Sequence, residues 1–198
     1  MQELPYNSSA RLLEVGCGNG KTAYLARIEG KCGWCCGIEL CDEPAAEARK
    51  RLDQVIVGNV EHMALELSEA SFDILILSEV LEHLVNPGAV LQKLLHFLKP
   101  GAIVLAGSPN VCHRSVVRML LAGRWEYAHS GIMDTTHLRW FTAHSYRALF
   151  EENGYIVDHV GPANPLRRKA RLVNALLFNR WEHLFYTQIY LRGHKPIA

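Results

Sequence analysis

The sequence has no long apolar run, almost no net charge and no repeated or low-complexity segment. Among 198 residues, 21 Lys and Arg face 20 Asp and Glu, so no overall field favours a nucleic acid as partner. No apolar run approaches the roughly 20 residues that span a bilayer, and the first residues do not resemble a secretion signal. With 49% apolar and 21% charged residues, the composition is globular. We therefore expect one cytoplasmic domain over residues 1–198, with no transmembrane segment and no nucleic-acid substrate.

The six cysteines lack the spacing of a metal site. Cys32 and Cys35 form one Cys-x-x-Cys pair, but no second Cys/His pair follows at zinc-finger spacing. Within a strand, Cys35 and Cys36 would point to opposite faces. We interpret the cysteines as reduced thiols that act as small apolar residues, and we predict no metal site. A metal or redox role for the Cys32–Cys35 pair is the open alternative.

Short apolar runs alternate with helical patterns along most of the chain. Strands are predicted at 11–15, 34–40, 54–57, 72–77, 102–106, 155–160 and 187–192, and helices at 21–28, 44–52, 88–98 and 143–153. The segment Lys99-Pro100-Gly101 is predicted as a turn, and Thr142 as the N-cap of the helix that follows it. Apolar strands joined by crossover helices predict a doubly wound, parallel α/β sheet. Two lid inserts, at about 111–142 and 163–186, interrupt this pattern.

The most informative motif is the segment 14–20, Glu14-Val15-Gly16-Cys17-Gly18-Asn19-Gly20, between the first strand and the first helix. Glycines at alternate positions after a buried strand let the backbone turn and approach an adenosine-containing cofactor closely. A dinucleotide fingerprint would place its third glycine at position 21, which is Lys21. The loop therefore favours a cofactor other than NAD.

Polar residues also close the next two predicted strands. Glu39 can accept hydrogen bonds from both hydroxyls of a ribose, and the side-chain carbonyl of Asn59 can accept one from an adenine amino group. The fourth strand runs into Ser78-Glu79-Val80 and then Leu81-Glu82-His83-Leu84. Together with the glycine loop, this set resembles the class I S-adenosylmethionine-dependent methyltransferases, in particular their small-molecule branch. The resemblance covers roughly residues 11–195.

This resemblance implies a Rossmann-like sheet of seven strands, mostly parallel, with one antiparallel strand near an edge. It implies S-adenosylmethionine as cofactor and S-adenosylhomocysteine as product. The glycine loop would hold the methionine portion, with Ser78 and Glu79 at its border, while Glu39 takes the ribose and Asn59 with Val60 the adenine. Asn59 stands where an aspartate is common in the family. The implied cofactor-binding residues are Glu14, Gly16, Cys17, Gly18, Asn19, Gly20, Glu39, Leu40, Asn59, Val60, Ser78 and Glu79.

The segment 131–142, which contains Asp134-Thr135-Thr136-His137, resembles a group of bacterial methyltransferases found beside glycosyltransferases. That resemblance implies a small-molecule acceptor such as a sugar or glycan precursor. Methyl transfer to a sugar hydroxyl needs a base, and Asp134 could orient His137 for this role. His83 is a further candidate in the core fold. The alternatives are that Asp134 only caps a turn, and that His137 and His83 only pack.

The second insert begins with a basic segment, 167–171, followed by apolar residues. An amphipathic helix of this kind could contact a phosphate-containing substrate or, as a peripheral contact, a membrane surface; a solvated helix face is the alternative. The oligomeric state stays open. Two other functional classes also remain. A methyltransferase-like protein could act by binding another enzyme, and a nicotinamide-dependent oxidoreductase is disfavoured by Lys21 and by the lack of a Tyr-x-x-x-Lys pair.

Overall fold

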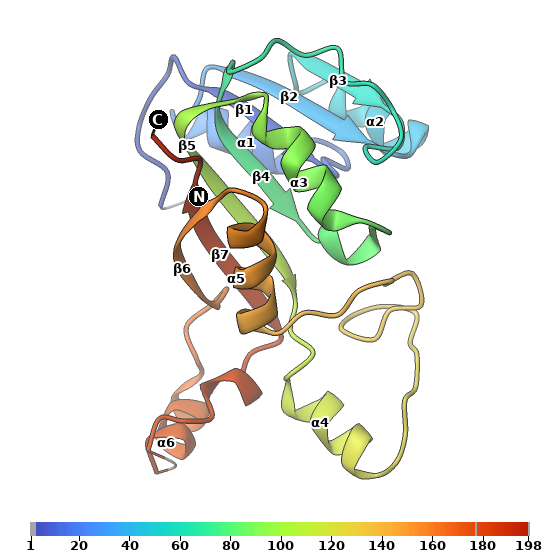
Figure 1. Ribbon diagram of the computed structural model, residues 1–198, viewed down its shortest axis with the longest axis vertical. Helices are drawn as coiled ribbons and strands as arrows, with labels where there is room; N and C mark the ends of the chain where they lie inside the picture. Colours follow the sequence, from blue (N-terminus) through green and yellow to red (C-terminus); the bar gives the residue numbers. More distant parts are fainter. Residues whose placement is uncertain (1–2, 177, 198) are drawn as a thin grey trace.

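A computed structural model describes residues 3–176 and 178–197 of the chain, so Leu177 of the second insert lies outside the described residues. Its centre is a seven-stranded sheet in the order β3-β2-β1-β4-β5-β7-β6 (Figure 1). The strands are β1 (Arg11–Val15), β2 (Trp34–Glu39), β3 (Gln54–Val57), β4 (Phe72–Ser78), β5 (Leu98–Pro109), β6 (Ile156–Pro162) and β7 (Gln188–His194). Only β7, which lies between β5 and β6, runs antiparallel to its neighbours. The predicted fold class is confirmed.

Helices α1 (Lys21–Ile28), α2 (Asp42–Ala48), α3 (Pro87–Leu95) and α5 (Ala143–Glu152) cover the two faces of this sheet. The chain also forms α4 (Arg114–Leu121), α6 (Arg168–Leu176) and the short 3-10 helices η1 (Leu81–His83) and η2 (Glu182–Leu184). The side chains of successive strand residues point to opposite faces of the sheet and belong to two different hydrophobic clusters. Leu12 packs with Ala23 and Ala26 of α1, whereas Leu13 packs with residues of α3 and α5. This alternation explains why the strands are apolar throughout.

The connection from α3 to β5 differs from the prediction. Helix α3 ends at Leu95, and β5 already begins at Leu98, which is fully buried and pairs with Phe72. The predicted turn at 99–101 is therefore wrong. Leu98 of β5 pairs with Phe72 of β4, but the next paired residue, Ile103, lies opposite Ile74. The Pro100-Gly101 segment between them is therefore an irregularity inside β5. A bulge tolerates a proline, which has no N–H to donate, and a glycine with φ of 75°.

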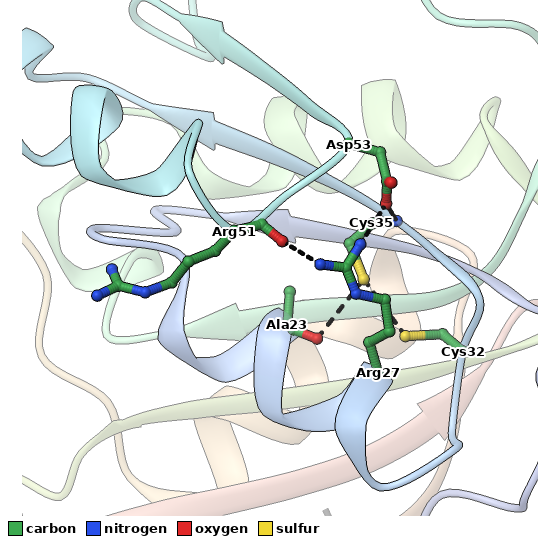
Figure 2. A network of polar contacts seen from close by, with 6 residues as sticks. All are labelled: Ala23, Arg27, Cys32, Cys35, Arg51 and Asp53. Atoms are coloured by element: carbon green, nitrogen blue, oxygen red, sulfur yellow. Dashed lines mark hydrogen bonds and ion pairs between the residues drawn. The ribbon is translucent and has the colours of Figure 1, made fainter.

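A polar network fixes α1 against the amino-terminal ends of β2 and β3 (Figure 2). The Arg27 guanidinium lies 3.0 Å from Oδ2 of Asp53 and also donates to the Arg51 carbonyl, and the same Oδ2 accepts from the Cys35 N–H at 2.8 Å. The thiols of Cys32 and Cys35 lie 3.4 Å apart as a hydrogen-bonded pair. All six cysteines are free thiols, as predicted, and four of them are buried. The network therefore holds α1, the helix that follows the glycine loop, in place.

The two predicted inserts extend from the carboxyl-terminal end of the sheet. Figure 1 shows α4 and α6 at the same end of the molecule, beyond the strands. Helix α4 lies in the first insert, for which no helix was predicted. Asn110, fully buried, ties the inserts together, because its Nδ2 donates to the carbonyls of His183 and Tyr186 at 2.7 and 2.9 Å. Among the described residues, no helix is long and apolar enough to cross a membrane.

Candidate functional site

The candidate site lies where the strand order reverses, between β1 and β4. In doubly wound sheets, ligands bind at this position, outside the carboxyl ends of the strands. A cavity of about 290 Å³ opens there. It is lined by Val15, Gly16, Ile38, Glu39, Leu40, Gly58, Asn59, Val60, Glu61, Glu79, Val80, His83 and Leu84. Seven of the predicted site residues are thus brought together: Gly16, Glu39, Leu40, Asn59, Val60, Glu79 and His83.

The glycine loop is bound to the end of β2. The backbone N–H groups of Gly16 and Cys17 donate to the carbonyl of Ile38 at 2.8 and 3.1 Å. Gly16 has φ of 66°, and a Cβ there would overlap Cγ2 of Val80, so only glycine fits. Gly18 also has a positive φ, of 53°, but a Cβ there would meet open space. The loop therefore closes one wall of the cavity with backbone rather than side chains.

Glu39 connects the glycine loop to the start of α2. Its Oε2 accepts from the Gly18 N–H at 2.7 Å, and its Oε1 accepts from the Cys41 N–H at 3.0 Å. These two bonds hold the carboxylate at the cavity wall, where it is 9% exposed. A carboxylate has about four acceptor sites, so two remain for hydroxyl groups of a ligand. This geometry suits the predicted contact with a ribose.

The end of β3 supplies the opposite part of the cavity. The Oδ1 of Asn59 accepts from the Glu61 N–H at 2.8 Å and so stabilises a turn. One acceptor position of that oxygen remains for an adenine amino group. The carboxylate of Glu61 accepts from the N–H groups of Val85 and Asn86, at 3.2 and 2.8 Å, and ties this turn to the segment before α3. Glu61 was not predicted, although it follows a predicted strand end as Asn59 does.

Besides Gly18, four predicted residues shape the loop without lining the cavity. Glu14 is 3% exposed, and its Oε2 accepts from the Ala23 N–H at 3.1 Å, which caps α1 from the neighbouring strand. Burial raises the pKa of Glu14 to about 7. Gly20 is the N-cap of α1 with φ of 75°, and Oδ1 of Asn19 accepts from the Lys21 N–H at 3.2 Å. Direct contact of Glu14, Asn19 and Gly20 with a cofactor stays a prediction.

Cys17, the fourth of these, points into the core. A Cβ added to Gly37 would lie 2.5 Å from its Sγ, so the thiol packs against β2. Burial raises the pKa of this thiol to about 12, which keeps it neutral. Its backbone N–H is already bound to the Ile38 carbonyl. The structure thus gives Cys17 a packing role, and its predicted cofactor contact remains untested.

Ser78 and Glu79 stand between two cavities. Glu79 lines the first cavity and also a second one, of about 200 Å³, to which Ser78, Gly107 and Tyr190 contribute. Glu79 has φ of 55°, a left-handed conformation that is uncommon outside glycine, and its N–H donates to the Gly107 carbonyl at 3.0 Å. Strained backbone of this kind is often found at functional sites. The position suits the predicted border of the methionine portion.

The structure brings His83 and His137 together, although 53 residues separate them. Their ring centroids lie 4.8 Å apart, edge to face. The Nδ1 of His83 lies 3.3 Å from the Thr136 carbonyl, and the Nδ1 of His137 lies 3.2 Å from the Ile132 carbonyl. A carbonyl accepts only, so in each neutral ring the hydrogen is assigned to Nδ1. In the neutral form, each ring therefore has a free Nε2, which can accept a proton.

The expected pairing of Asp134 with His137 is corrected by these contacts. Oδ1 of Asp134 accepts from the N–H and the hydroxyl of Thr136, at 2.8 and 2.7 Å, and these bonds lower the pKa of Asp134. Among the described residues it is the Ile132 carbonyl, not this carboxylate, that orients His137. The local turn competes successfully for the carboxylate, since Asp readily bonds its own backbone two residues on. Thr142 is the N-cap of α5, as predicted.

Glu82, which the sequence analysis did not single out, is the buried centre of this cluster. It is 1% exposed, its Oε2 accepts from the Ser108 hydroxyl at 3.2 Å, and its Oε1 has no partner among the described residues. Burial raises the pKa of Glu82 to about 8. Its backbone carbonyl accepts from the N–H groups of Leu138 and Arg139, at 2.8 and 3.0 Å. Glu82 thus fixes the first insert over η1.

Glu82, His83 and His137 could also hold a metal ion. Each offers one ligand atom, and these atoms lie within 4.8 Å of one another. Carboxylate oxygen and imidazole nitrogen are ligands that zinc and other divalent ions accept. The prediction that the protein uses no metal is not tested by this geometry and stays a prediction.

Comparisons with known proteins agree on one family. A family model described as a methyltransferase domain matches residues 2–160. Two proteins named ubiquinone biosynthesis O-methyltransferase, from Neisseria meningitidis and Xylella fastidiosa, are 27% and 32% identical over 133 and 135 residues. These alignments cover 64% and 61% of this chain and 55% and 54% of those proteins, so the chain spans about half the length of the curated relatives it matches.

The fold is also shared with solved structures. An S-adenosylmethionine-dependent methyltransferase from Mesorhizobium loti superimposes with a TM-score of 0.69. The match covers 98% of this chain and 94% of that chain, at 16% sequence identity. At this low sequence identity, the superposition shows only that the two proteins share a fold.

Proposed function

Because the chain belongs to the class I S-adenosylmethionine-dependent methyltransferases, we propose that it transfers a methyl group from S-adenosylmethionine to a hydroxyl oxygen of a small molecule. The observation that carries this proposal is the His83–His137 pair beside the cofactor cavity, in which Nδ1 of each ring faces a backbone carbonyl. A hydroxyl acceptor needs a base, whereas a neutral amine does not. The name O-methyltransferase of the relatives supports the same choice.

The cofactor would lie along the first cavity. Glu39 would accept hydrogen bonds from the ribose, and Asn59 with Val60 would contact the adenine. The glycine loop at Gly16 and the strained Glu79 would border the methionine portion. S-adenosylmethionine supplies an electrophilic methyl group on a sulfonium sulfur when it is bound.

The residues around η1 would then prepare the acceptor. Its oxygen must lie in line with the methyl carbon and the sulfur, so that the new O–C bond forms as the C–S bond breaks and the electron pair stays on sulfur. The hydroxyl proton passes to an imidazole Nε2. His83 lines the cofactor cavity, so we assign it as the base, with His137 packed against its ring as a positioning residue or second acceptor.

The acceptor would place its hydroxyl beside His83 in the first cavity and extend past Glu79 into the second cavity. This cavity shares Ala163 and Gln188 with a cleft of about 520 Å³ between the inserts. Arg114 and Arg167 line that cleft. Two guanidinium groups at this position favour an acceptor that carries a phosphate, and a phosphorylated or nucleotide-linked sugar has the required hydroxyl as well.

The test is a methyl-transfer assay that detects S-adenosylhomocysteine. Phosphorylated sugars, sugar nucleotides, the corresponding free sugars and catechols would be offered as acceptors. We expect product with a phosphorylated hydroxyl compound and much less with its unphosphorylated counterpart. Turnover only with amines would contradict the proposed base. Cofactor binding without any methylated product, together with capture of a second enzyme, would instead favour the binding-protein alternative.

A further inference from the structure

The charge of the chain is strongly polarised, although its sum is close to zero. The inserts at 111–142 and 163–186 contain nine Lys and Arg but only three Asp and Glu, a formal charge of +6. The rest of the chain therefore carries −5, since the whole carries +1. Figure 1 shows the helices of both inserts, α4 and α6, at one end of the molecule. That end is cationic, and the sheet domain behind it is anionic.

The same end exposes large apolar side chains. Of 17 such side chains among the described residues, ten lie in the two inserts, which make up 56 of the 198 residues. Leu121 is 84% exposed, Leu176 80% and Phe178 87%. The others are Leu120, Trp125, Tyr127, Leu172, Val173 and Trp181, together with Leu138, whose N–H donates to the Glu82 carbonyl and which therefore lies over η1 rather than at this end. Single exposed apolar residues are normal, but a cluster at one end of a molecule marks an interaction surface.

Cationic and apolar side chains share the same sides of both helices. In α6, Lys169 lies three and four residues before Leu172 and Val173, and all three are exposed. In α4, Arg118 lies three residues before Leu121, and both are exposed. Long Lys and Arg stems can lie along apolar groups while their charged ends reach outward. Such a mixture suits the boundary between phosphate headgroups and acyl chains.

The cations of this end are available for phosphates. Among residues 3–176 and 178–197, one ion pair involves an insert cation, Arg124 with Glu126 at 3.5 Å, and both side chains are well exposed. The other eight cations have no carboxylate within ion-pair distance in that part of the chain. One of them, Arg139, lies over η1 and donates to the carbonyls of Val85 and Leu138, which leaves seven at this end. Each Lys or Arg near an anionic bilayer adds to the attraction of the protein to its surface. Buried apolar side chains add a contribution that salt does not screen.

We propose that the end formed by α4 and α6 docks on the surface of an anionic lipid bilayer. The apolar side chains Leu121, Leu176 and Phe178 enter the headgroup region, and the surrounding cations contact lipid phosphates. A free phosphorylated metabolite would use the arginines but would leave these apolar groups in water. The docking does not depend on the proposed methyl transfer.

The test is co-sedimentation of the purified full chain with vesicles. One vesicle set contains phosphatidylcholine with phosphatidylglycerol, and the other contains phosphatidylcholine alone. We expect binding to the first set that weakens as salt rises, and little binding to the second. Leu176→Ser with Phe178→Ser should reduce binding at least tenfold, since two exposed apolar side chains no longer enter the bilayer.

Matched control variants distinguish binding through this surface from nonspecific electrostatic or hydrophobic binding. Arg167→Gln with Arg171→Gln should weaken binding by about tenfold or more, whereas Arg49→Gln with Lys50→Gln, exposed in the turn after α2, should leave it unchanged. Ile28→Ser, which changes a 65% exposed residue on α1, is the apolar control. Affinity for S-adenosylhomocysteine, measured in every variant, reports that the sheet domain is intact.

Three results would overturn the proposal. They are equal binding to both vesicle sets, unchanged binding in the insert variants, and a concentration-dependent dimer that Leu176→Ser with Phe178→Ser disperses. The last would assign the surface to a second copy of the chain. Failure of methyl transfer would not affect any of these measurements.

Discussion

Replacing Glu82 with glutamine should change how the stability of the protein depends on pH. Glu82 is 1% exposed, and burial raises its pKa from 4.5 to about 8. Between these two values the folded protein holds a proton on Glu82 that the unfolded chain releases. Because the folded state then binds more protons, its free energy of unfolding falls as pH rises through this window.

The magnitude follows from the width of the window. One group with such a shift lowers the free energy of unfolding by about 1.4 kcal/mol per pH unit, or roughly 3 kcal/mol between pH 5.5 and 7.5. Glu14, with a pKa of about 7, acts in the same direction. The effect of Glu14 is the same in the unmodified protein and in Glu82→Gln, so it cancels in the difference between their free energies of unfolding. Glutamine keeps an oxygen that can accept from Ser108 and cannot ionise.

The assay is urea unfolding followed by circular dichroism at pH 5.5, 6.5, 7.5 and 8.5. We expect Glu82→Gln to gain roughly 3 kcal/mol relative to the unmodified protein as pH rises from 5.5 to 7.5. Glu152→Gln, at an exposed position of α5, is the matched control and should run parallel to the unmodified protein. Parallel profiles for Glu82→Gln as well would refute the assignment of a buried, neutral carboxyl group.

Three further predictions concern the site. Gly16→Ala should abolish measurable binding of S-adenosylhomocysteine, because its Cβ would overlap Val80. Gly18→Ala, with open space around the new Cβ, should weaken binding less, and equal losses of affinity in calorimetry would contradict this. His83→Ala should lower turnover by ~10²–10⁴ and leave cofactor affinity unchanged. His137→Ala should shift the pH profile of turnover. If the turnover and its pH profile are unchanged in both variants, neither histidine takes part in the mechanism. Dialysis against EDTA should leave turnover unchanged if the cluster around η1 acts as a base, and a loss restored by Mg²⁺ or Zn²⁺ would assign it to a metal.

Much of the fold could be predicted from local sequence. The predicted ranges 11–15, 54–57 and 21–28 match β1, β3 and α1 at both ends, because each is a short run bounded by glycine or polar residues. The strand-end residues Glu39 and Asn59 were also placed correctly at the cavity, since parallel strands end at one edge of the sheet. These features depend on periodicity and on topology alone.

The cluster around η1 could not be predicted in the same way. His83 and His137 meet only because Leu138 and Arg139 donate to the Glu82 carbonyl, a contact across more than 50 residues. The expected bond between Asp134 and His137 is not formed among the described residues, because Oδ1 of Asp134 accepts from Thr136 in a local turn; a catalytic role of Asp134 stays a prediction. Burial of the side chain, which gives Glu82 its raised pKa, depends on the complete fold.

The central claim is that the cavity between β1 and β4 binds S-adenosylmethionine, and calorimetric titration with S-adenosylhomocysteine tests it most directly. We expect binding of this product, no binding of NADH, and a loss of ~1–3 kcal/mol in Glu39→Ala, the scale of charge-assisted hydrogen bonds. Binding of NADH, absence of binding by either compound, or an unchanged affinity in Glu39→Ala would contradict the assignment of this site.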